Sequence, residues 1–489
     1  MLVLSIDIGT SSTRTALFDH RGRRFERTTA QATHALATDR EGRAEIDPAE
    51  LLAGVRSCIG STLSAARRDR RLRGRAIDAV GTSCFWHSLV GTAADGTPLT
   101  PVVTWADSRC REDAARLRRD LGERKVQART GCMVRASFWP AKLAWFTRTQ
   151  PRLAKRIARW MSPAEWLYLQ LCSGLRCAHG MATGTGLYDP SALAWDRRMI
   201  ADCAVTAAQL SPISDAPLML DRRWARAWPE LAESAWYPAI GDGAANNLGA
   251  GATRPGWAAI NYGTSGAVRI LRDRGAARSP FGLFCYRVDE RRFLVGGAIS
   301  NAGSLRAWAL AQLRLPDDPL AIERALAQRP GPDHGLRVLP FWMAERAPSW
   351  REDLRGAIVG ITQATTALDI LQAVTEASFH RLATIIERLP GADRRLEIVV
   401  GGGIQKSRVA MQRLADVLGR AVRPSLEPES SLRGAAVFAL EKLGASDDIE
   451  PAAGAAIRPR RAYARAFAAE RVALAQLEGT LYPETRTPR

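Results

Sequence analysis

The sequence of 489 residues lacks an apolar run as long as the about 18 residues that a membrane-spanning helix needs. It also lacks a basic stretch before its first apolar run, since MLVLSIDIG leads directly into a strand-like pattern rather than a secretory signal. Cysteines are few, eight at scattered positions, and no two are spaced as CxxC. These absences predict a cytoplasmic protein with reduced, structural thiols, and they argue against a disulfide framework or a zinc site.

Two common nucleotide-binding signatures are missing as well. No GxxxxGK[ST] segment is present, which excludes a P-loop protein, and no GxGxxG follows a strand to make a dinucleotide site. The net charge of +19 raises the question of nucleic-acid binding. However, arginine runs such as RRDRRLRGR lack interleaved aromatic residues and any recognised DNA- or RNA-binding motif. A solvated, arginine-rich surface is the favoured interpretation.

What the sequence does contain is an alternation of short β-rich runs with longer helical patterns, which predicts an α/β protein. One plan occurs twice: IDIGTSSTRTALF from Ile6 and INYGTSGAVRIL from Ile260 each read as a strand, a Gly-Thr-Ser turn and a second strand. A recurring supersecondary unit predicts two related domains. We place them at residues 1–245 and 246–489, with the glycine-rich GDGAANNLGAGATRPG at their junction.

The second half also carries a well-punctuated helix and a glycine turn. TALDILQAVTEASFHRLATIIERLPG predicts a helix that begins with a capping box of Thr366 and Asp369 and stops at Pro390. LEIVV predicts a strand that enters residues 401–403, all glycine, and a helix that ends near Gly419 follows. The glycines could let an adenosine approach the backbone closely, although a simple strand-to-helix turn explains this motif alone.

The paired Gly-Thr-Ser turns are candidates for phosphate binding. Small residues leave backbone N–H groups and short hydroxyls accessible, so such turns form concave anion sites, to which Arg14 could add charge. Each turn alone could equally be a tight connection between strands. The occurrence of two such turns, one of them beside the carboxylate of Asp7, favours phosphate binding.

Phosphoryl transfer to an alcohol needs metal-bound phosphates, an in-line hydroxyl and a carboxylate that accepts the hydroxyl proton. Asp242 follows an apolar approach and lies among glycines and alanines, which makes it the candidate base, although a turn aspartate would look the same. Asp7, at the end of the first strand, suits the second role, which is to hold magnesium through water near the phosphates.

Two segments are candidates for binding the acceptor. GTSCFWHSLVG carries Trp86 and His87, and TPVVTWADSRC carries Trp105, Asp107 and Arg109 at alternate positions. If the second segment is extended, its three side chains project to one face and offer a polyol a flat apolar group, an acceptor and a donor. A buried tryptophan beside a surface ion pair and a core histidine are the alternatives from local sequence.

In this order the motifs resemble those of the FGGY carbohydrate kinases, within the sugar kinase, heat-shock protein and actin superfamily. The resemblance extends from Asp7 to about Ala436 and includes IDIGTSSTR, IGDGAANNLGAG, NYGTSG, GAIVGITQATTALDILQAVTE and GGGIQKSRVAMQRLADVLG with ESSLRGAA. WHSLVGTAADGTPLTPVVTWADSR and FWMAERAPSWREDLRGAIVGI are similar to the gluconokinase branch. Trp86 departs from the family, which commonly has methionine before the histidine.

The resemblance implies two ribonuclease-H-like domains, of the actin and hexokinase ATPase type, around a central cleft. The first domain would bind the sugar and carry the first phosphate motif, and the second would carry the second phosphate motif and the adenosine motif. Asp242 would take the proton of the sugar hydroxyl, and Asp7 would place Mg²⁺. The residues on the ATP side are Gly9, Thr10, Ser11, Ser12, Thr13, Arg14, Gly263, Thr264, Gly303, Gly402, Gly403 and Ser407. Those on the sugar side are Trp86, His87, Trp105, Asp107 and Arg109.

The expected reaction is therefore ATP-dependent phosphorylation of a terminal hydroxyl of an open-chain sugar acid, D-gluconate to 6-phosphogluconate. Arg109, Arg135 and Lys142 are candidates to pair with the carboxylate of such an acid, and the sequence does not choose among them. A kinase for xylulose or another neutral polyol is the near alternative, and an actin- or heat-shock-type ATPase without a sugar substrate is the alternative from another class. We expect no membrane and no nucleic-acid partner, and the sequence leaves open whether the chain forms a homodimer.

Overall fold

The structure is a computed structural model that describes residues 1–329, 331–393 and 395–483. The chain forms two compact units, each assembled from three segments of the sequence. Unit 1 comprises Met1–Gly249, Arg272–Leu294 and Glu429–Pro451, and unit 2 comprises Ala250–Leu271, Val295–Pro428 and Ala452–Arg489. The predicted boundary between residues 245 and 246 lies near the first change of unit, but a single boundary does not include the two later segments that return to unit 1.

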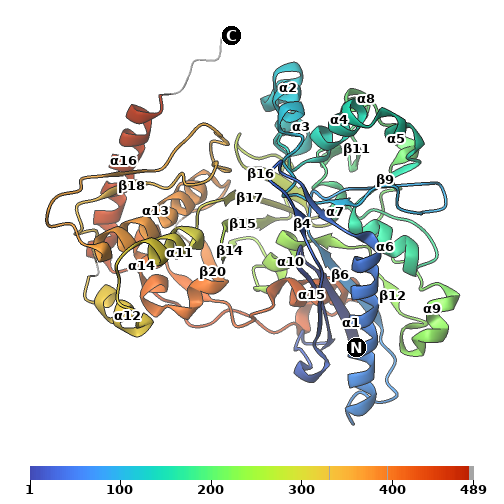
Figure 1. The fold of residues 1–489 in the computed structure, drawn as a ribbon. Helices are drawn as coiled ribbons and strands as arrows, with labels where there is room; N and C mark the ends of the chain where they lie inside the picture. The colour runs from blue at the N-terminus through green and yellow to red at the C-terminus, as the bar shows by residue number, and fades with distance from the viewer. Residues whose placement is uncertain (330, 394, 484–489) are drawn as a thin grey trace. The chain divides into compact units, whose positions relative to one another are not determined.

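The centre of unit 1 is a mixed sheet with the strand order β12-β6-β1-β2-β3, and β13 also pairs with β6 (Figure 1). Its strands are β1 (Leu2–Ile8), β2 (Ser12–Asp19), β3 (Ala30–Thr33), β6 (Ala79–Cys84), β12 (Ala235–Trp236) and β13 (Ile240–Gly241). β1 and β2 form the predicted antiparallel hairpin, whereas β6 runs parallel to both β1 and β13. The segments that follow β1, β6 and β13 therefore begin at the same edge of the sheet, where α/β proteins commonly bind ligands.

Two helices, α1 (Pro48–Arg68) and α15 (Ser430–Lys442), cover opposite faces of this sheet. The Thr62 hydroxyl of α1 lies 2.7 Å from that of Thr15 on β2. On the other face, Ser5 of β1 donates a hydrogen bond to the Leu432 carbonyl of α15. The register pairs Ser5 with Ala16, the neighbour of Thr15, so the side chains of Ser5 and Thr15 point to opposite faces.

The remaining elements of unit 1 lie mostly between β3 and β12 in the sequence. The short strands are β4 (Ala37–Thr38), β5 (Ala44–Ile46), β7 (Val90–Thr92), β8 (Val102–Val103), β9 (Arg159–Met161), β10 (Tyr188–Asp189), β11 (Ala194–Trp195) and β16 (Phe284–Arg287). The helices are α2 (Arg111–Leu121), α3 (Glu123–Thr130), α4 (Trp139–Thr149), α5 (Pro151–Arg156), α6 (Pro163–Leu171), α7 (His179–Ala182), α8 (Arg197–Asp202), α9 (Arg222–Ala227) and α10 (Asp242–Gly249). Trp139, Leu143 and Phe146 share one face of α4 and enter a separate hydrophobic core of this region.

Unit 2 is built on a second mixed sheet, which contains the order β17-β15-β14-β20-β21 (Figure 1). Its strands are β14 (Trp257–Tyr262), β15 (Gly266–Arg272), β17 (Phe293–Ile299), β20 (Glu397–Gly401) and β21 (Val422–Pro424), and β18 (Arg337–Leu339) with β19 (Ala357–Val359) form a separate pair. The helices are α11 (Gly303–Gln312), α12 (Pro319–Ala327), α13 (Ala367–Arg388), α14 (Arg408–Leu418) and α16 (Arg461–Leu481). β14 is antiparallel to β15 and parallel to β20, as β1 is to β2 and β6.

The main sequence-based predictions of the fold are confirmed. Both units are α/β, and each has a Gly-Thr-Ser turn at the corresponding place, between β1 and β2 and between β14 and β15. Thr366 and Asp369 form the predicted capping box of α13. β20 ends at Gly401, and α14 ends at Gly419 in a left-handed conformation.

All eight cysteines are buried and free. Across the described residues, no helix combines the length and apolar character that a membrane crossing requires.

Candidate active-site residues in the two units

Cross-strand pairing gathers a charged group on the α15 face of the unit 1 sheet. The register places Asp7 of β1 opposite Arg14 of β2 and opposite Ser83 of β6. Glu429 immediately precedes α15, and its Oε2 atom lies 3.6 Å from the Nε atom of Arg14. Only 7% of Asp7 is exposed. Two strand pairings and one helix therefore bring two carboxylates and a guanidinium together next to the first Gly-Thr-Ser turn.

The carboxyl of Asp7 is electrostatically coupled to that of Asp242. Burial is the largest cause that raises the pKa of Asp7, to about 6, while the nearby Ser83 hydroxyl lowers it. The Asp242 carboxylate raises this pKa further, the Arg14 guanidinium lowers it, and Glu429 adds a smaller increase. A magnesium ion suits such a carboxylate pair, because it prefers oxygen ligands and is commonly held by one or two carboxylates together with phosphates and water.

Asp242 lies at the junction of β13 and α10. Its Oδ1 atom accepts a hydrogen bond of 2.8 Å from the Gly243 amide, and its backbone carbonyl accepts one of 3.4 Å from the Ser431 hydroxyl of α15. α10 and α15 approach closely, and glycine permits this: a Cβ on Gly249 would lie only 1.8 Å from the Ser430 carbonyl oxygen. This helix pair fixes Asp242 relative to β1. Sequence reasoning missed the role of α15, although the small residues of SSLRGAA were a signal of close helix packing.

Trp86 is buried, and its contacts reach the residue before Asp242. The indole Nε1 donates a hydrogen bond of 2.7 Å to the Gly180 carbonyl of α7. The ring lies against Gly241, where a Cβ would come within 1.7 Å of the Trp86 Cε2 atom. It also makes an edge contact with Tyr286, with 4.9 Å between ring centroids. The predicted role of Trp86 at the sugar stays a prediction, and the structure adds that its ring shapes the backbone next to Asp242.

His87 is half-buried and has the left-handed backbone conformation, with a φ of 66°. Its Nδ1 atom contacts the Gly184 carbonyl, and since a carbonyl only accepts, this nitrogen carries the proton. The imidazole lies 4.4 Å from the Phe138 ring and 5.9 Å from the Tyr286 ring. Sequence reasoning missed Tyr286; its signal was the alternation of aromatic residues in FCYR, where Phe284 and Tyr286 stack at 4.6 Å.

Trp105 is separated from its two predicted companions. Residues 104–110 form turns after β8, so the segment is not extended and the condition under which Trp105, Asp107 and Arg109 would share one face is not met. The indole is 43% exposed and donates a hydrogen bond of 2.9 Å to the Thr10 hydroxyl of the first Gly-Thr-Ser turn. The Trp105 amide donates to the Ser88 hydroxyl at 3.0 Å. Trp105 thus joins the acceptor segment to the candidate phosphate turn within unit 1.

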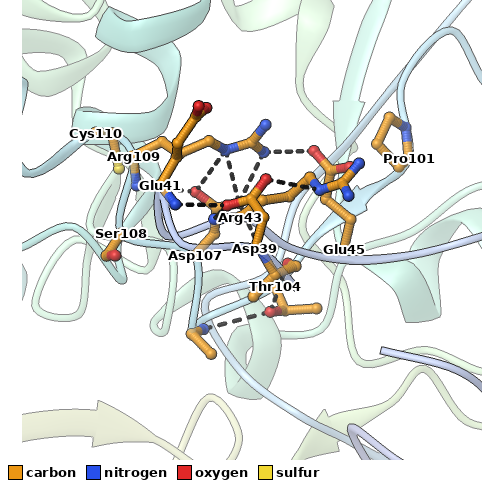
Figure 2. A network of polar contacts seen from close by, with 12 residues as sticks. Asp39, Glu41, Arg43, Glu45, Pro101, Thr104, Asp107, Ser108, Arg109 and Cys110 are labelled. Atoms are coloured by element: carbon orange, nitrogen blue, oxygen red, sulfur yellow. Dashed lines mark hydrogen bonds and ion pairs between the residues drawn. The ribbon is translucent and has the colours of Figure 1, made fainter. Parts of the chain in front are cut away.

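Asp107 and Arg109 instead belong to a polar network, which Figure 2 shows. Asp107 is 2% exposed and accepts hydrogen bonds from the Ala44 amide at 3.0 Å and from the Arg109 Nε at 3.0 and 3.1 Å. Arg109 also pairs with Glu45 of β5, and its guanidinium lies 4.5 Å from the centre of the Trp145 ring. Turning Asp107 inward to the Ala44 amide explains why the segment is not extended. The network anchors the turn that presents Trp105.

The other cations considered for a substrate carboxylate also have partners within unit 1. Arg135 pairs with Glu123 and donates to the Val134 carbonyl. Lys142 is 1% exposed and donates to the backbone carbonyls of His87 and Ser137. The carboxylate of a sugar acid would therefore meet cations that already bind other groups of the protein.

The candidate nucleotide residues of unit 2 surround a pocket of about 660 Å³. Five of the six predicted residues line it: Gly263, Thr264, Gly303, Gly403 and Ser407. The sixth, Gly402, has a φ of 92°, and a Cβ there would lie 2.5 Å from the Tyr262 carbonyl oxygen. The amides of Gly303 and Ser304 donate to the carbonyls of Gly263 and Thr264, at 2.9 and 3.1 Å, which fixes the start of α11 against the turn.

The rest of the pocket wall was not predicted from the sequence. Ser407 caps α14 by accepting from the Ala410 amide at 2.9 Å, and it donates to Glu323 of α12 at 2.7 Å. Arg306 of α11 pairs with the same glutamate at 3.1 Å. Tyr262 and Phe379 add aromatic surface. A pocket of this size with glycine backbone, aromatic groups and a few polar side chains suits a nucleotide-sized ligand.

Comparison with known proteins decides the family. The model of the FGGY family of carbohydrate kinases, N-terminal domain, matches residues 2–221, and that of the C-terminal domain matches residues 258–442. The chain belongs to the FGGY family of carbohydrate kinases. It is accordingly a phosphotransferase, and this family excludes the alternative of an actin- or heat-shock-type ATPase. The C-terminal match includes α15, although α15 packs in unit 1.

Individual relatives differ in their named substrates. A gluconokinase from Bacillus subtilis (strain 168) is 28% identical over 470 residues, which cover 92% of this chain and 89% of the relative. A glycerol kinase from Rhizorhabdus wittichii is 30% identical over 452 residues, covering 88% and 86%. Two crystal structures from Lactobacillus acidophilus share the fold at 23% identity: a ligand-bound xylulose kinase with a TM-score of 0.91, covering 99% of each chain, and a gluconate kinase with a TM-score of 0.90, covering 99% and 98%.

Proposed function

We propose that this FGGY kinase transfers the γ-phosphoryl group of ATP to the terminal hydroxyl of an open-chain sugar acid, with D-gluconate as the acceptor. The observation that carries the reaction is the coupled pair of carboxylates, Asp7 and Asp242, at the carboxyl edge of the unit 1 sheet. The choice of gluconate is supported by the gluconokinase relative, which is similar over 92% of the chain.

In this proposal Asp242 is the general base. A carboxylate that accepts the proton of the attacking hydroxyl is the main chemical group that such a transfer asks of the protein. Asp242 is half-buried, its carboxylate accepts from the Gly243 amide of α10, and its carbonyl accepts from the Ser431 hydroxyl of α15, so both helices contribute to its position. A rigidly held base favours the in-line geometry that the reaction requires.

Asp7 would hold Mg²⁺ beside the phosphates. Burial, and to a smaller extent the Asp242 carboxylate, raise the pKa of Asp7, so its negative charge is costly in this place and a divalent cation would offset that charge. When bound, the ion would polarise the phosphoryl oxygens and neutralise developing charge. Gly9 to Arg14 would contribute amides, hydroxyls and one guanidinium to the phosphates, because they occupy the turn and the first positions of β2 directly after Asp7.

For the acceptor, we propose that Trp105 and His87 face the sugar. The exposed indole of Trp105 offers the apolar surface on which sugar carbons stack, beside the Thr10 hydroxyl. The half-buried imidazole of His87 offers polar contacts to hydroxyls. Trp86, Asp107 and Arg109 would support these two groups. In unit 2, the pocket of Gly263, Gly303 and Gly403 would take the nucleotide.

A kinase for xylulose or another neutral polyol is the second candidate. It is favoured by the internal pairing of Arg109, Arg135 and Lys142, because these three cations already have partners in the protein and none of the three is reserved for a carboxylate. A thermal-shift panel with a non-hydrolysable ATP analogue separates the two: gluconate should raise the melting temperature, whereas xylulose and glycerol should not. Stabilisation by xylulose with no response to gluconate would exclude the sugar-acid proposal and leave the family assignment intact.

A further inference from the structure

Lys142 carries an ammonium group that is buried, and burial of a charge is energetically unfavourable. It projects from the first turns of α4 and is 1% exposed. Its Nζ atom donates to two backbone carbonyls, those of His87, at 2.8 Å, and Ser137. Burial lowers the pKa of Lys142 to about 8, and the neighbouring Cys110 and Asp107 raise it only in part. A methionine or leucine would fill this volume without losing the hydration of a charge. The presence of a lysine here therefore points to a role for its ammonium group.

The partner of that ammonium is itself under strain. His87 is one of few non-glycine residues of the described chain with a positive φ, at 66°, and such a conformation is unfavourable for a residue with a Cβ. Residues in this conformation persist only where their surroundings hold them. A hydrogen bond from a buried ammonium to the carbonyl of the strained residue is a strong restraint of this kind, because charge-assisted bonds are stronger than neutral ones.

The first turns of α4 restrain the next residue as well. Trp139 lies three residues before Lys142, so both side chains share one helix face. The Trp139 Nε1 donates to the Ser88 carbonyl at 3.1 Å. The Ser88 hydroxyl in turn accepts from the Trp105 amide. Two side chains of α4 therefore hold two consecutive carbonyls, in a segment that contains His87 and binds the amide of Trp105, the two residues that face the sugar in the proposed function.

We propose that Lys142 is a positioning residue for the acceptor, which acts by fixing the backbone of His87 and thereby the direction of its imidazole. Lys142 does not pair with a substrate carboxylate in this proposal, because its donors are directed to backbone carbonyls in the protein interior. The inference rests on the proposed function only through the assignment of His87 to the acceptor site.

The first test is Lys142→Met in the full chain, with Lys442→Met as the matched control. Lys442 is on α15, where it lies 3.8 Å from Asp215. We expect Lys142→Met to raise KM for gluconate by about tenfold, as loss of a charge-assisted hydrogen bond commonly does, and to leave KM for ATP within about twofold. Lys442→Met should change neither constant. An unchanged KM for gluconate in folded Lys142→Met, or an equal rise of both KM values, would overturn the proposal.

The second test asks whether Lys142 acts through His87. In a double-mutant cycle, His87→Ala should raise KM for gluconate, and Lys142→Met added to it should have little further effect. Additive effects would show that Lys142 acts independently of the imidazole and would overturn the proposal. If Lys142→Met does not fold, Trp139→Phe replaces it, since it removes only the bond to the Ser88 carbonyl. That variant should raise KM for gluconate in the same direction by a smaller factor, and no change would count against the restraint.

A third measurement separates this proposal from the proposed function. If the wild-type protein phosphorylates no sugar or sugar acid, the function fails, but melting temperatures still test the restraint. Glycine adopts a positive φ without strain, so the change in melting temperature caused by Lys142→Met should differ between a His87→Gly background and the wild type. Equal changes in the two backgrounds would show that Lys142 does not restrain the left-handed residue.

Discussion

Replacing Asp7 by asparagine should stabilise the protein while it removes activity. Burial in the structure raises the pKa of Asp7 from 3.8 to about 6. Since one pKa unit corresponds to about 1.4 kcal/mol, the ionised carboxylate lowers the free energy of unfolding by up to roughly 3 kcal/mol above pH 6. Asp7→Asn removes the charge and keeps the shape. In a unit of this size the melting temperature should rise by about 2 °C for each kcal/mol recovered.

The sign of the pH dependence follows from proton binding. Between the unfolded pKa of 3.8 and the folded value of about 6, the folded state holds a proton on Asp7 that the unfolded state has lost. Raising the pH through this window therefore lowers the stability of the wild type relative to Asp7→Asn. Differential scanning calorimetry without nucleotide or Mg²⁺, at several pH values, should show equal melting temperatures near pH 4 and an advantage for Asp7→Asn that levels off above pH 6.

Two results would refute this reasoning. If Asp7→Asn melts lower than the wild type at pH 7, the surroundings stabilise the carboxylate by more than its burial costs. If Asp7→Asn keeps full activity in Mg²⁺, Asp7 does not place the ion. Thr10→Ala is a suitable control for the melting measurements. It removes the hydroxyl that accepts from Trp105 and leaves the charges of Asp7, Arg14 and Glu429 unchanged.

Three further predictions concern the base, the restraint on His87 and the nucleotide turn. Asp242→Asn should leave the melting-temperature shifts caused by ATP analogue and gluconate nearly intact and lower kcat by on the order of a hundredfold or more; normal turnover would show that the base is misassigned. Because the pKa of Lys142 is lowered to about 8, its ammonium loses a proton above that pH, so KM for gluconate should rise there in the wild type and not in Lys142→Met. Gly402→Ala, with a φ of 92° and its new Cβ 2.5 Å from the Tyr262 carbonyl, should destabilise by about 2 kcal/mol or more and raise KM for ATP; Gly403→Ala, whose Cβ would meet nothing within 4 Å, should melt within about 1 °C of the wild type.

Elements with strong local signals could be predicted from the sequence. The hairpin of β1 and β2, the capped helix α13 and the passage from β20 through glycines to α14 all follow from residues that are neighbours in the chain. The recurrence of Gly-Thr-Ser predicted the matching pairs of strands in the two units. These features depend on turn chemistry and hydrophobic periodicity, which a single sequence displays.

Features that depend on distant contacts could not be predicted in this way. The small residues of SSLRGAA indicate close helix packing, but they do not show that α15 returns to unit 1 or that its partner is α10, nor that Glu429 reaches Arg14. Asp107 alternates with Trp105 in the sequence, yet its carboxylate turns inward to the Ala44 amide, a residue 63 positions earlier. Local pattern predicts which residues can share a face, whereas long-range hydrogen bonds decide which of them do.

The most direct test of the account is a coupled ADP-release assay with purified protein, ATP and Mg²⁺ across a small library that contains gluconate, xylulose, glycerol and no sugar. We predict rapid ADP release with gluconate, formation of a phosphate ester at its terminal hydroxyl, and slow release in the absence of sugar. Rapid release with xylulose and none with gluconate would contradict the proposed substrate, and equal release with and without any acceptor would contradict phosphoryl transfer to a sugar altogether.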